Sequence, residues 1–420
     1  MIKPLQQISN NKTGNRTMPV LFTLTLILTS MIGLAQTAYI TNRADKTVSV
    51  INVATNTVSA TIPVGIGTNP FGVSVIPDGT KVYVTNDNSP GTVSVINTST
   101  NIVSATITVG SNPGGVCVSP DGGTLYVANY FDNSVSVINT STNSVLTTIK
   151  VGNFPAGVSV TPDGTKVYVA ANNVSVINTT TNTVSDTIIA GAGPYGVSVS
   201  PDGNKVYITD ESSDSVRVIN TATNAVSAAI TVGNHPYGVT VSPDGSIVYV
   251  AISNNSISVI NTATNSVSAT IPVGSLPIGV SVSPDGIKLY AVNEYSNTVS
   301  VINTTTNTVS ATIPVGNFPT AFGNFISTHT ITGIASINIE PSSISIYPNP
   351  ATNQLTIHTS SFHNEAATIS IMNVLGEVMH EEKVKWSNEI SMNINNFSAG
   401  IYFLQLKSES GSVMKRFVKG

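Results

Sequence analysis

The residues able to do chemistry are few in the first three quarters of the chain. Residues 38–327 contain one histidine, His235, two arginines, Arg43 and Arg217, and no tryptophan. A copper or zinc site built from several imidazoles is therefore excluded there, because such a site needs more than one nitrogen ligand. The single cysteine, Cys117, has no histidine near it in sequence, and we interpret it as a small buried strand residue.

Carboxylates are the remaining candidates for catalysis or metal binding. Asp210, Glu211 and Asp214 form the densest acidic cluster, which fits a solvated loop and also a Ca²⁺ site with oxygen ligands. A carboxylate acid–base pair leaves little motif, so a lactonase- or lyase-like enzyme stays an alternative. Six other aspartates recur in Pro-Asp-Gly, which predicts turn capping: Asp78, Asp121, Asp163, Asp202, Asp244 and Asp285. We predict no catalytic constellation, no metal and no cofactor.

The composition indicates which elements must position these residues. Only 9% of the 420 residues are charged, and 17 Lys and Arg stand against 21 Asp and Glu. An average soluble chain carries about 25% charged residues. Ser, Thr and Asn fill the gap, together with 32 Gly and 22 Pro, which predicts a β-rich, turn-rich protein with a neutral polar surface. The low positive charge argues against nucleic acid as a partner.

The first 35 residues have the features of an export signal. Basic residues precede an uncharged run from Pro19 to Ala35, and small residues, Gly33 and Ala35, stand where a signal peptidase needs them. We predict a signal peptide over residues 1–35, cleaved between Ala35 and Gln36. The run is shorter than the ~20 residues of a membrane span, so we predict no membrane span in the mature chain.

Internal repetition dominates residues 38–327. Each unit has four short runs of alternating β-branched residues, separated by Pro-Asp-Gly and Asn-rich turns. Four strands in ~42 residues are typical of a β-propeller blade, and stacking around an axis covers both faces of each blade. The motif Tyr-Val-Thr-Asn and its variants begin at seven tyrosines: Tyr39, Tyr83, Tyr126, Tyr168, Tyr207, Tyr249 and Tyr290.

The two ends of the array predict how the ring closes. It begins with the second strand of a blade, at residues 38–42, and ends with a first-strand segment at residues 319–327. We therefore predict an all-β fold in which residues 36–327 form a seven-bladed β-propeller, closed by strand 319–327 beside strand 38–42. A linker at residues 328–343 and a small β-sandwich at residues 344–420 follow.

The repeat resembles the YVTN-type β-propeller repeat family, which is known from microbial surface and secreted proteins. The resemblance covers residues 38–327 and rests on the sevenfold recurrence of the motif. It departs at Tyr168–Ala171, Tyr207–Asp210 and Tyr249–Ile252, where the Asn is lost. We expect those three blades to lose a turn hydrogen bond without losing the fold.

The C-terminal segment contains four short motifs in a fixed order. Their residues are Tyr347, Pro348, Asn349, Pro350, Leu375, Gly376, Gly400, Ile401, Tyr402, Phe403, Lys415, Arg416, Phe417, Val418 and Lys419. In the order and spacing of these motifs the segment resembles the type A sorting domain of the type IX secretion system of Bacteroidota. The resemblance implies the type IX secretion machinery as a partner, passage through the periplasm, and a final location outside the cell or on its outer-membrane surface. Both release and attachment to surface polysaccharide fit.

Function should lie where the repeats differ, beside the repeated Pro and after Tyr-Val-Thr-Asn. Both loop sets belong to one face, and aromatic rings beside amides and carboxylates suit recognition of a glycan or a protein, although loop packing explains any single one. We predict a non-catalytic binding or adhesion module, with an enzyme or a structural surface-layer component as alternatives. The candidate ligand-binding residues are Arg43, Phe71, Tyr130, Phe131, Phe154, Tyr195, Glu211, His235, Tyr237, Glu294, Tyr295 and Phe318.

Two short segments also resemble the O-glycosylation sequence of Bacteroidota, in which an Asp precedes Ser or Thr and an apolar residue. They centre on Thr187 and Ser215. In a chain this rich in threonine, two short matches leave both positions open.

Overall fold

The computed structural model describes residues 36–65, 67–327, 344–359, 366–373, 378–385, 389–398, 400–408 and 411–420. The chain divides into two compact units, residues 1–331 and 332–420. The described part is built from β-strands, apart from one short 3-10 helix, η1 (Glu211–Ser213). The predicted signal peptide, including Ala35, and the predicted linker lie outside the described residues.

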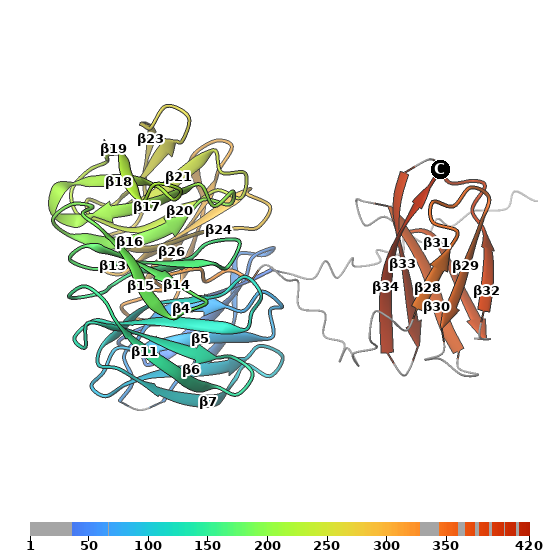
Figure 1. Cartoon of the computed structure of the whole chain (residues 1–420), viewed down its shortest axis with the longest axis horizontal. Coiled ribbons are helices and arrows are strands. Elements are labelled where there is room, and N and C mark those ends of the chain that lie inside the picture. The colour runs from blue at the N-terminus through green and yellow to red at the C-terminus, as the bar shows by residue number, and fades with distance from the viewer. Residues whose placement is uncertain are drawn as a thin grey trace, which may run out of the picture. The chain divides into compact units, whose positions relative to one another are not determined.

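Seven antiparallel sheets form the first unit, and Figure 1 shows them in the colours from blue to orange. Each sheet is one blade, and the first strands of neighbouring blades lie next to one another. The predicted seven-bladed propeller is therefore confirmed.

Blades 2 to 7 have four strands each, in sequential order. Blades 2 to 4 comprise β4 (Pro70–Val75), β5 (Lys81–Asn86), β6 (Gly91–Asn97), β7 (Ile102–Val109), β8 (Pro113–Val118), β9 (Thr124–Asn129), β10 (Ser134–Asn139), β11 (Ser144–Lys150), β12 (Val158–Val160), β13 (Lys166–Ala170), β14 (Val174–Asn178) and β15 (Thr183–Ile188). Blades 5 to 7 comprise β16 (Pro194–Val199), β17 (Lys205–Asp210), β18 (Ser215–Asn220), β19 (Ala225–Thr231), β20 (Pro236–Val241), β21 (Ile247–Ile252), β22 (Ser256–Asn261), β23 (Ser266–Pro272), β24 (Pro277–Val282), β25 (Lys288–Asn293), β26 (Thr298–Asn303) and β27 (Thr308–Pro314).

Blade 1 joins the two ends of the array. Its strands β1 (Thr37–Asn42), β2 (Thr47–Asn52) and β3 (Thr57–Pro63) are completed by residues 318–327. This closing segment lies beside β1, where the Tyr39 amide donates to the Phe325 carbonyl at 2.9 Å. It is not a regular strand, because only isolated bridges join it to β1 and Ala321 has a positive φ of 43°. The kink carries Phe322 across to Gly72 of blade 2.

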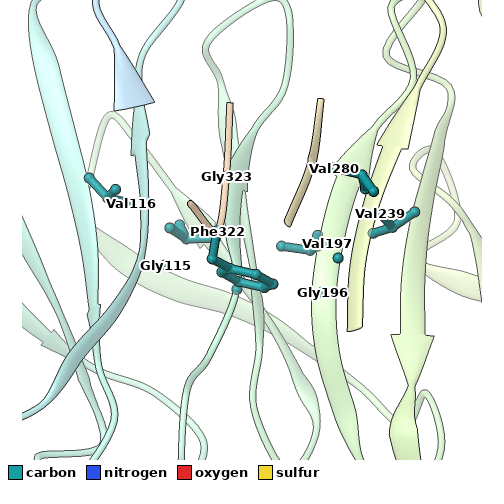
Figure 2. Close-up of a pocket in the computed structure, with 11 residues that line it drawn as sticks. Gly115, Val116, Gly196, Val197, Val239, Val280, Phe322 and Gly323 are labelled. Carbon is teal, nitrogen blue, oxygen red and sulfur yellow. The ribbon is translucent and has the colours of Figure 1, made fainter. Parts of the chain in front are cut away.

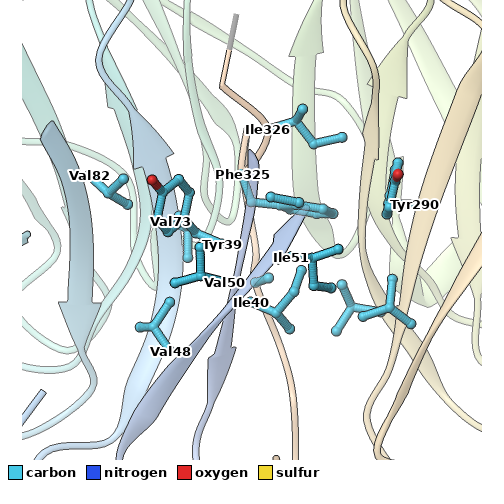
Figure 3. Packing of buried hydrophobic residues seen from close by; sticks show 14 of the residues in the cluster. Tyr39, Ile40, Val48, Val50, Ile51, Val73, Val82, Tyr290, Phe325 and Ile326 are labelled. Atoms are coloured by element: carbon cyan, nitrogen blue, oxygen red, sulfur yellow. The ribbon is translucent and has the colours of Figure 1, made fainter. Parts of the chain in front are cut away.

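The hydrophobic core lies between the blades. Figure 3 shows Tyr290 of blade 7, Tyr39 and Ile51 of blade 1, and Val82 of blade 2 around Phe325 of the closing segment. Each fully buried Val, Ile or Phe contributes about 1.5–3 kcal/mol relative to exposure. Because every row of side chains is covered by the next blade, no blade has a complete core by itself.

A second link between blades uses the lysine that begins the second strand. Lys81 Nζ donates to the Thr140 carbonyl of the next blade at 2.7 Å, and Lys166 reaches Thr221 in the same way at 2.9 Å. Lys288 of blade 7 reaches the Val53 carbonyl of blade 1 at 2.6 Å, which ties the last blade to the first. These lysines were not singled out in the sequence, since a lone Lys after a turn looks like a surface charge.

The Thr of Tyr-Val-Thr-Asn also joins neighbouring blades. The Thr209 hydroxyl accepts from the Gly196 amide at 2.6 Å and donates to the Tyr237 carbonyl of the next blade at 2.7 Å. A Cβ on Gly196 would collide with that carbonyl, so only glycine permits this approach. In blade 1, Thr41 makes the equivalent bonds to the Ala321 amide at 2.7 Å and the Phe71 carbonyl at 2.8 Å.

The Asn of the motif makes hydrogen bonds to the neighbouring strand, so the prediction that it makes a turn hydrogen bond is wrong. Asn42 Nδ2 donates to Thr47 at 3.0 Å and to Ser49 at 2.8 Å, both on the following strand. In blade 5 the same place is taken by an ion pair between Asp210 and Arg217 at 3.1 Å. The blade therefore replaces the lost amide with a different cross-strand contact.

The Pro-Asp-Gly aspartates cap their own turns. Asp244 accepts the Ser246 amide at 3.0 Å and the Ser242 hydroxyl at 2.6 Å. These hydrogen bonds lower the pKa of Asp244 to about 2. These hydrogen bonds are the turn capping that the recurrence of Pro-Asp-Gly predicted for the six aspartates.

The second unit contains two antiparallel sheets that share one core. One sheet has β28 (Ile344–Tyr347), β29 (Gln354–Thr359) and β32 (Glu389–Asn393), and the other has β31 (Val378–Lys385), β30 (Ala366–Asn373), β33 (Gly400–Ser408) and β34 (Gly411–Lys419). Leu355 and Ile357 of the first sheet are buried in one cluster with Ile369 and Leu404 of the second. The predicted small β-sandwich has this arrangement.

Thr41→Val should destabilise the ring, because it leaves the buried Ala321 amide without an acceptor. An orphaned buried donor costs about 1–3 kcal/mol. Urea unfolding of the full chain should show a lower midpoint for Thr41→Val, while Thr61→Val on the exposed outer strand β3 should match the parent. Equal midpoints for all three chains would refute the role given to Thr41.

Acid should weaken the ring through its turn aspartates. A carboxyl whose pKa is lowered from about 4 to about 2 by folding stabilises the fold above pH 4, and this contribution is lost as the pH falls towards 2. The unfolding midpoint of Asp244→Asn should therefore fall less between pH 5 and pH 2 than that of the parent. Thermal melts followed by circular dichroism at both pH values check this, and identical pH dependence would contradict it.

Candidate functional site

Each blade holds its two variable loops together by the same backbone hydrogen bond. The residue after the Tyr-Val-Thr-Asn position donates its amide to the residue before the repeated Pro, as in Glu211 to Gly193 at 2.8 Å and Glu294 to Leu276 at 2.9 Å. The same bond recurs from Arg43 to Phe318, Asp87 to Asn69, Tyr130 to Asn112 and Ser253 to His235. In blade 4 it is shifted by one residue, because Asn172 donates to Asn153, two residues before Pro155. One face of the ring therefore carries variable side chains on a repeated and rigid frame.

Several residues before the Pro have a left-handed backbone. Phe154, His235 and Phe318 have φ values of 57°, 48° and 52°, which is uncommon for large side chains. Their amides are held by side chains of the preceding blade, as in Phe154 to Asn133 and Phe318 to Asn297, both at 2.9 Å. This conformation leaves Phe154 52% and Phe318 48% exposed.

Four aromatic rings form a connected cluster at the axis of the ring. Tyr195 of blade 5 contacts Tyr237 of blade 6 and Phe322 of the closing segment, with centroids 5.5 and 5.3 Å apart. Phe322 also contacts Phe71 of blade 2 at 5.9 Å. We call Phe71, Tyr195, Glu211, Tyr237 and Glu294 the central mouth, with Phe322 as its floor.

The channel below the mouth is nearly filled. It is lined by inner-strand glycines and valines, and Figure 2 shows the Phe322 ring between Val116 and Val197. The free volume is about 30 Å³, which is the room of one or two water molecules. Ligands of larger size have access to the mouth rather than to the channel.

The charged residues around the mouth form two groups, one on blades 1 and 2 and the other on blades 5 to 7. On blades 1 and 2, Arg43 pairs with Asp87 at 2.5 Å and lies 5.9 Å from the Phe71 ring. On blades 5 and 6, the Glu211 carboxylate lies 3.8 Å from Nδ1 of His235. On blade 7, burial raises the pKa of Glu294, and the positive charge of Arg43 partly opposes this effect. Burial also raises the pKa of Tyr237, and the charges of Glu211 and Glu294 raise it further.

Two aromatic platforms flank the mouth on the same loop face. Tyr130 contacts Phe131 at 5.3 Å and Phe154 at 5.2 Å, and Phe131 is 60% exposed. Tyr295, 64% exposed, contacts Phe318 at 6.0 Å. The structure thus distributes the twelve candidate residues over the mouth, its charged rim of Arg43 and His235, and these two platforms.

The acidic cluster predicted as a loop or a cation site is dispersed. Asp210 is buried against Arg217, Asp214 accepts the His235 amide at 2.9 Å, and Glu211 turns to the His235 ring. Within the described ranges no group of three or more His, Cys, Asp or Glu side chains is arranged to hold a metal ion.

The remaining single-residue candidates differ in exposure. Ser215 is only 5% exposed, whereas Thr187 lies exposed on the outer strand β15, so only Thr187 is accessible for modification in the folded ring. Cys117 lies half-buried in β8, and burial raises the pKa of its thiol to about 11.

Parts of the sorting motif come together in the second unit. Asn349 Oδ1 accepts the Val418 amide at 2.9 Å, and Ala351 pairs with Lys419 in a parallel bridge, so the Tyr-Pro-Asn-Pro segment lies along the terminal strand. Tyr402, which follows Gly400 at the start of β33, donates its hydroxyl proton to the Ser398 carbonyl at 3.0 Å. Tyr347, Pro348 and Pro350 are exposed, Lys415 is half-buried, and Gly376 lies outside the described residues.

Fold and C-terminal segment together define an exported seven-bladed β-propeller with a sorting domain. Residues 345–420 match the family described as secretion system C-terminal sorting domain, and residues 36–152 match the family described as lactonase, 7-bladed beta-propeller. The predicted sorting domain is confirmed, and the chain is secreted or held at the cell surface through the type IX secretion machinery.

Solved structures agree with this fold. Kuenenia stuttgartiensis hydrazine synthase is 25% identical, with a TM-score of 0.56 over 60% of this chain and 88% of that chain. A functionally unknown protein from Desulfotomaculum acetoxidans is 18% identical, with a TM-score of 0.59 over 69% of this chain and 100% of that chain. No curated protein matches the chain. Among the described residues, no helix combines the length and the apolar character of a membrane-spanning segment.

The sequence did not indicate Phe322 as a candidate residue, because its place at the axis becomes visible only in the closed propeller. Phe322→Ala should lower the free energy of unfolding by about 3–5 kcal/mol, since the buried ring leaves a cavity. Phe131→Ala, in an exposed ring, should stay within about 0.5 kcal/mol of the parent. Denaturant unfolding of both variants checks the contrast, which equal losses would contradict.

Proposed function

We propose that the secreted or surface-displayed chain is a non-catalytic binding or adhesion module that takes a glycan or protein ligand on its loop face. The observation that supports this most is the concentration of aromatic side chains there: Phe131, Phe154, Tyr295 and Phe318 are each 48–64% exposed. Exposed rings of this size are unusual on a polar surface and mark interaction sites. Their backbones are held by the repeated hydrogen bonds, so the rings are presented in a fixed arrangement.

A second candidate function is a secreted lactonase- or lyase-like enzyme. The similarity of residues 36–152 to lactonase propellers supports it, as does the raised pKa of Glu294, which suits a general acid. The nearly filled channel weighs against it, because a substrate would have to react at the open mouth. We therefore place it behind the binding role.

The full chain, purified in its secreted form, tests the binding role on glycan and protein arrays. The double variant Phe131→Ala/Phe154→Ala should bind the selected ligand at least about 10-fold more weakly, because stacking on both rings is lost. Ile102→Ala, which truncates an exposed apolar residue of the outer strand β7, should bind like the parent.

The same preparation tests the alternative with lactone substrates. Turnover that Glu294→Gln abolishes would overturn the binding-only role. Ordered lattices formed without ligand would instead indicate a structural surface-layer component.

A further inference from the structure

The central mouth holds two carboxylates, Glu211 and Glu294, and in the described part of the chain neither forms an ion pair with a lysine or an arginine. Glu211 lies in η1 of blade 5 and Glu294 follows β25 of blade 7, and burial together with the charges of both raises the pKa of Tyr237 on the intervening blade 6. Among the described residues, the Glu294 carboxylate has no hydrogen bond or ion pair, and the Glu211 carboxylate has only the His235 ring at 3.8 Å. The nearby Arg43 is bound to Asp87.

An unpaired carboxylate in partial burial is unfavourable for the free protein. Removing its charge from water costs free energy that only a hydrogen bond or an opposite charge recovers. A ligand that supplies the missing partner would recover this free energy. The mouth is open towards solvent, because Glu211, Tyr195 and Tyr237 all keep partial exposure.

The aromatic residues favour one kind of cation over another. Rings of Tyr195 and Tyr237 lie 5.5 Å apart, and Phe322 and Phe71 continue the aromatic surface. Burial raises the pKa of both tyrosines and the charges of Glu211 and Glu294 raise it further, so both carboxylates act on this pair of rings. Ring faces attract ammonium groups, whereas a hard metal ion needs six or more oxygen ligands. The described part of the mouth offers two carboxylates and no further side-chain acid.

We propose that the central mouth binds an organic ammonium group, held by Glu211 and Glu294 and in contact with the rings of Tyr195 and Tyr237. A lysine side chain of a protein and an amino sugar of a glycan both present this chemistry. The inference rests on the proposed binding function and names the chemical group that this part of the loop face recognises.

Titration calorimetry of the full chain with butylammonium, glucosamine, a lysine-containing peptide and CaCl₂, at constant ionic strength, tests the proposal. The ammonium probes should bind, and Glu211→Gln and Glu294→Gln should each weaken binding about 10-fold, with a larger loss in the double variant. Glu382→Gln, which changes the same group type in the second unit, should bind like the parent. The glucosamine and peptide arms identify the source of the amine.

Stability measurements keep the test independent of folding defects. Glu294→Gln should not lower the unfolding midpoint, because it removes an unpaired charge. Tyr237→Leu gives a second variant that should weaken binding while both carboxylates stay in place. Binding of Ca²⁺ instead of the ammonium probes would overturn the inference, as would equal affinities of the parent and the double glutamine variant. Neutral glycans or proteins that bind the loop face independently of Glu211 and Glu294 would overturn the ammonium site and leave the proposed function standing.

Discussion

The structure depends on the close approach of each inner strand to the next blade. The Gly of the Pro-x-Gly-Val strand brings its backbone against a carbonyl of the neighbouring blade, and no side chain fits between them. Where the motif has Thr, as at Thr41 and Thr209, the hydroxyl bridges the same two backbones. Lys288 and the closing segment make the equivalent contacts from the last blade to the first. These contacts define the ring and bury its Val and Ile rows.

The same constraint separates the scaffold from the site. Because Tyr, Gly, Thr and Lys at repeated positions hold the blades together, the residues beside them are free to vary on one face. This gives a chain of low charge a loop face in which seven equivalent places carry residues as different as Arg43, Tyr130 and Glu294. The side chains that differ between the blades lie at these positions. The mouth and the two platforms each form from such side chains on nearby blades.

Sequence reasoning was strongest where the fold is periodic. The recurrence of Tyr-Val-Thr-Asn predicted the propeller, and Pro-Asp-Gly predicted the capped turns, because both are local patterns with one physical cause. It failed where the cause is non-local. The cross-strand bonds of Asn42, the links made by Lys81 and the position of Phe322 depend on contacts between distant blades. For the candidate residues, the sequence indicated that they share one face. Their division into a mouth and two platforms follows from contacts between aromatic side chains of different blades, which the spacing of the repeats does not predict.

Variable positions carry recognition, whereas repeated positions carry stability. A triple variant separates the two roles: Glu211→Ser, Tyr237→Ile and Glu294→Ser give these three positions the residues that stand at equivalent positions of other blades. Unfolding midpoint and ammonium affinity are then measured on the same preparation. We expect the unfolding midpoint of the triple variant to stay within a few degrees of the parent and its ammonium binding to be lost. A collapsed midpoint, or binding that survives the triple replacement, would contradict it.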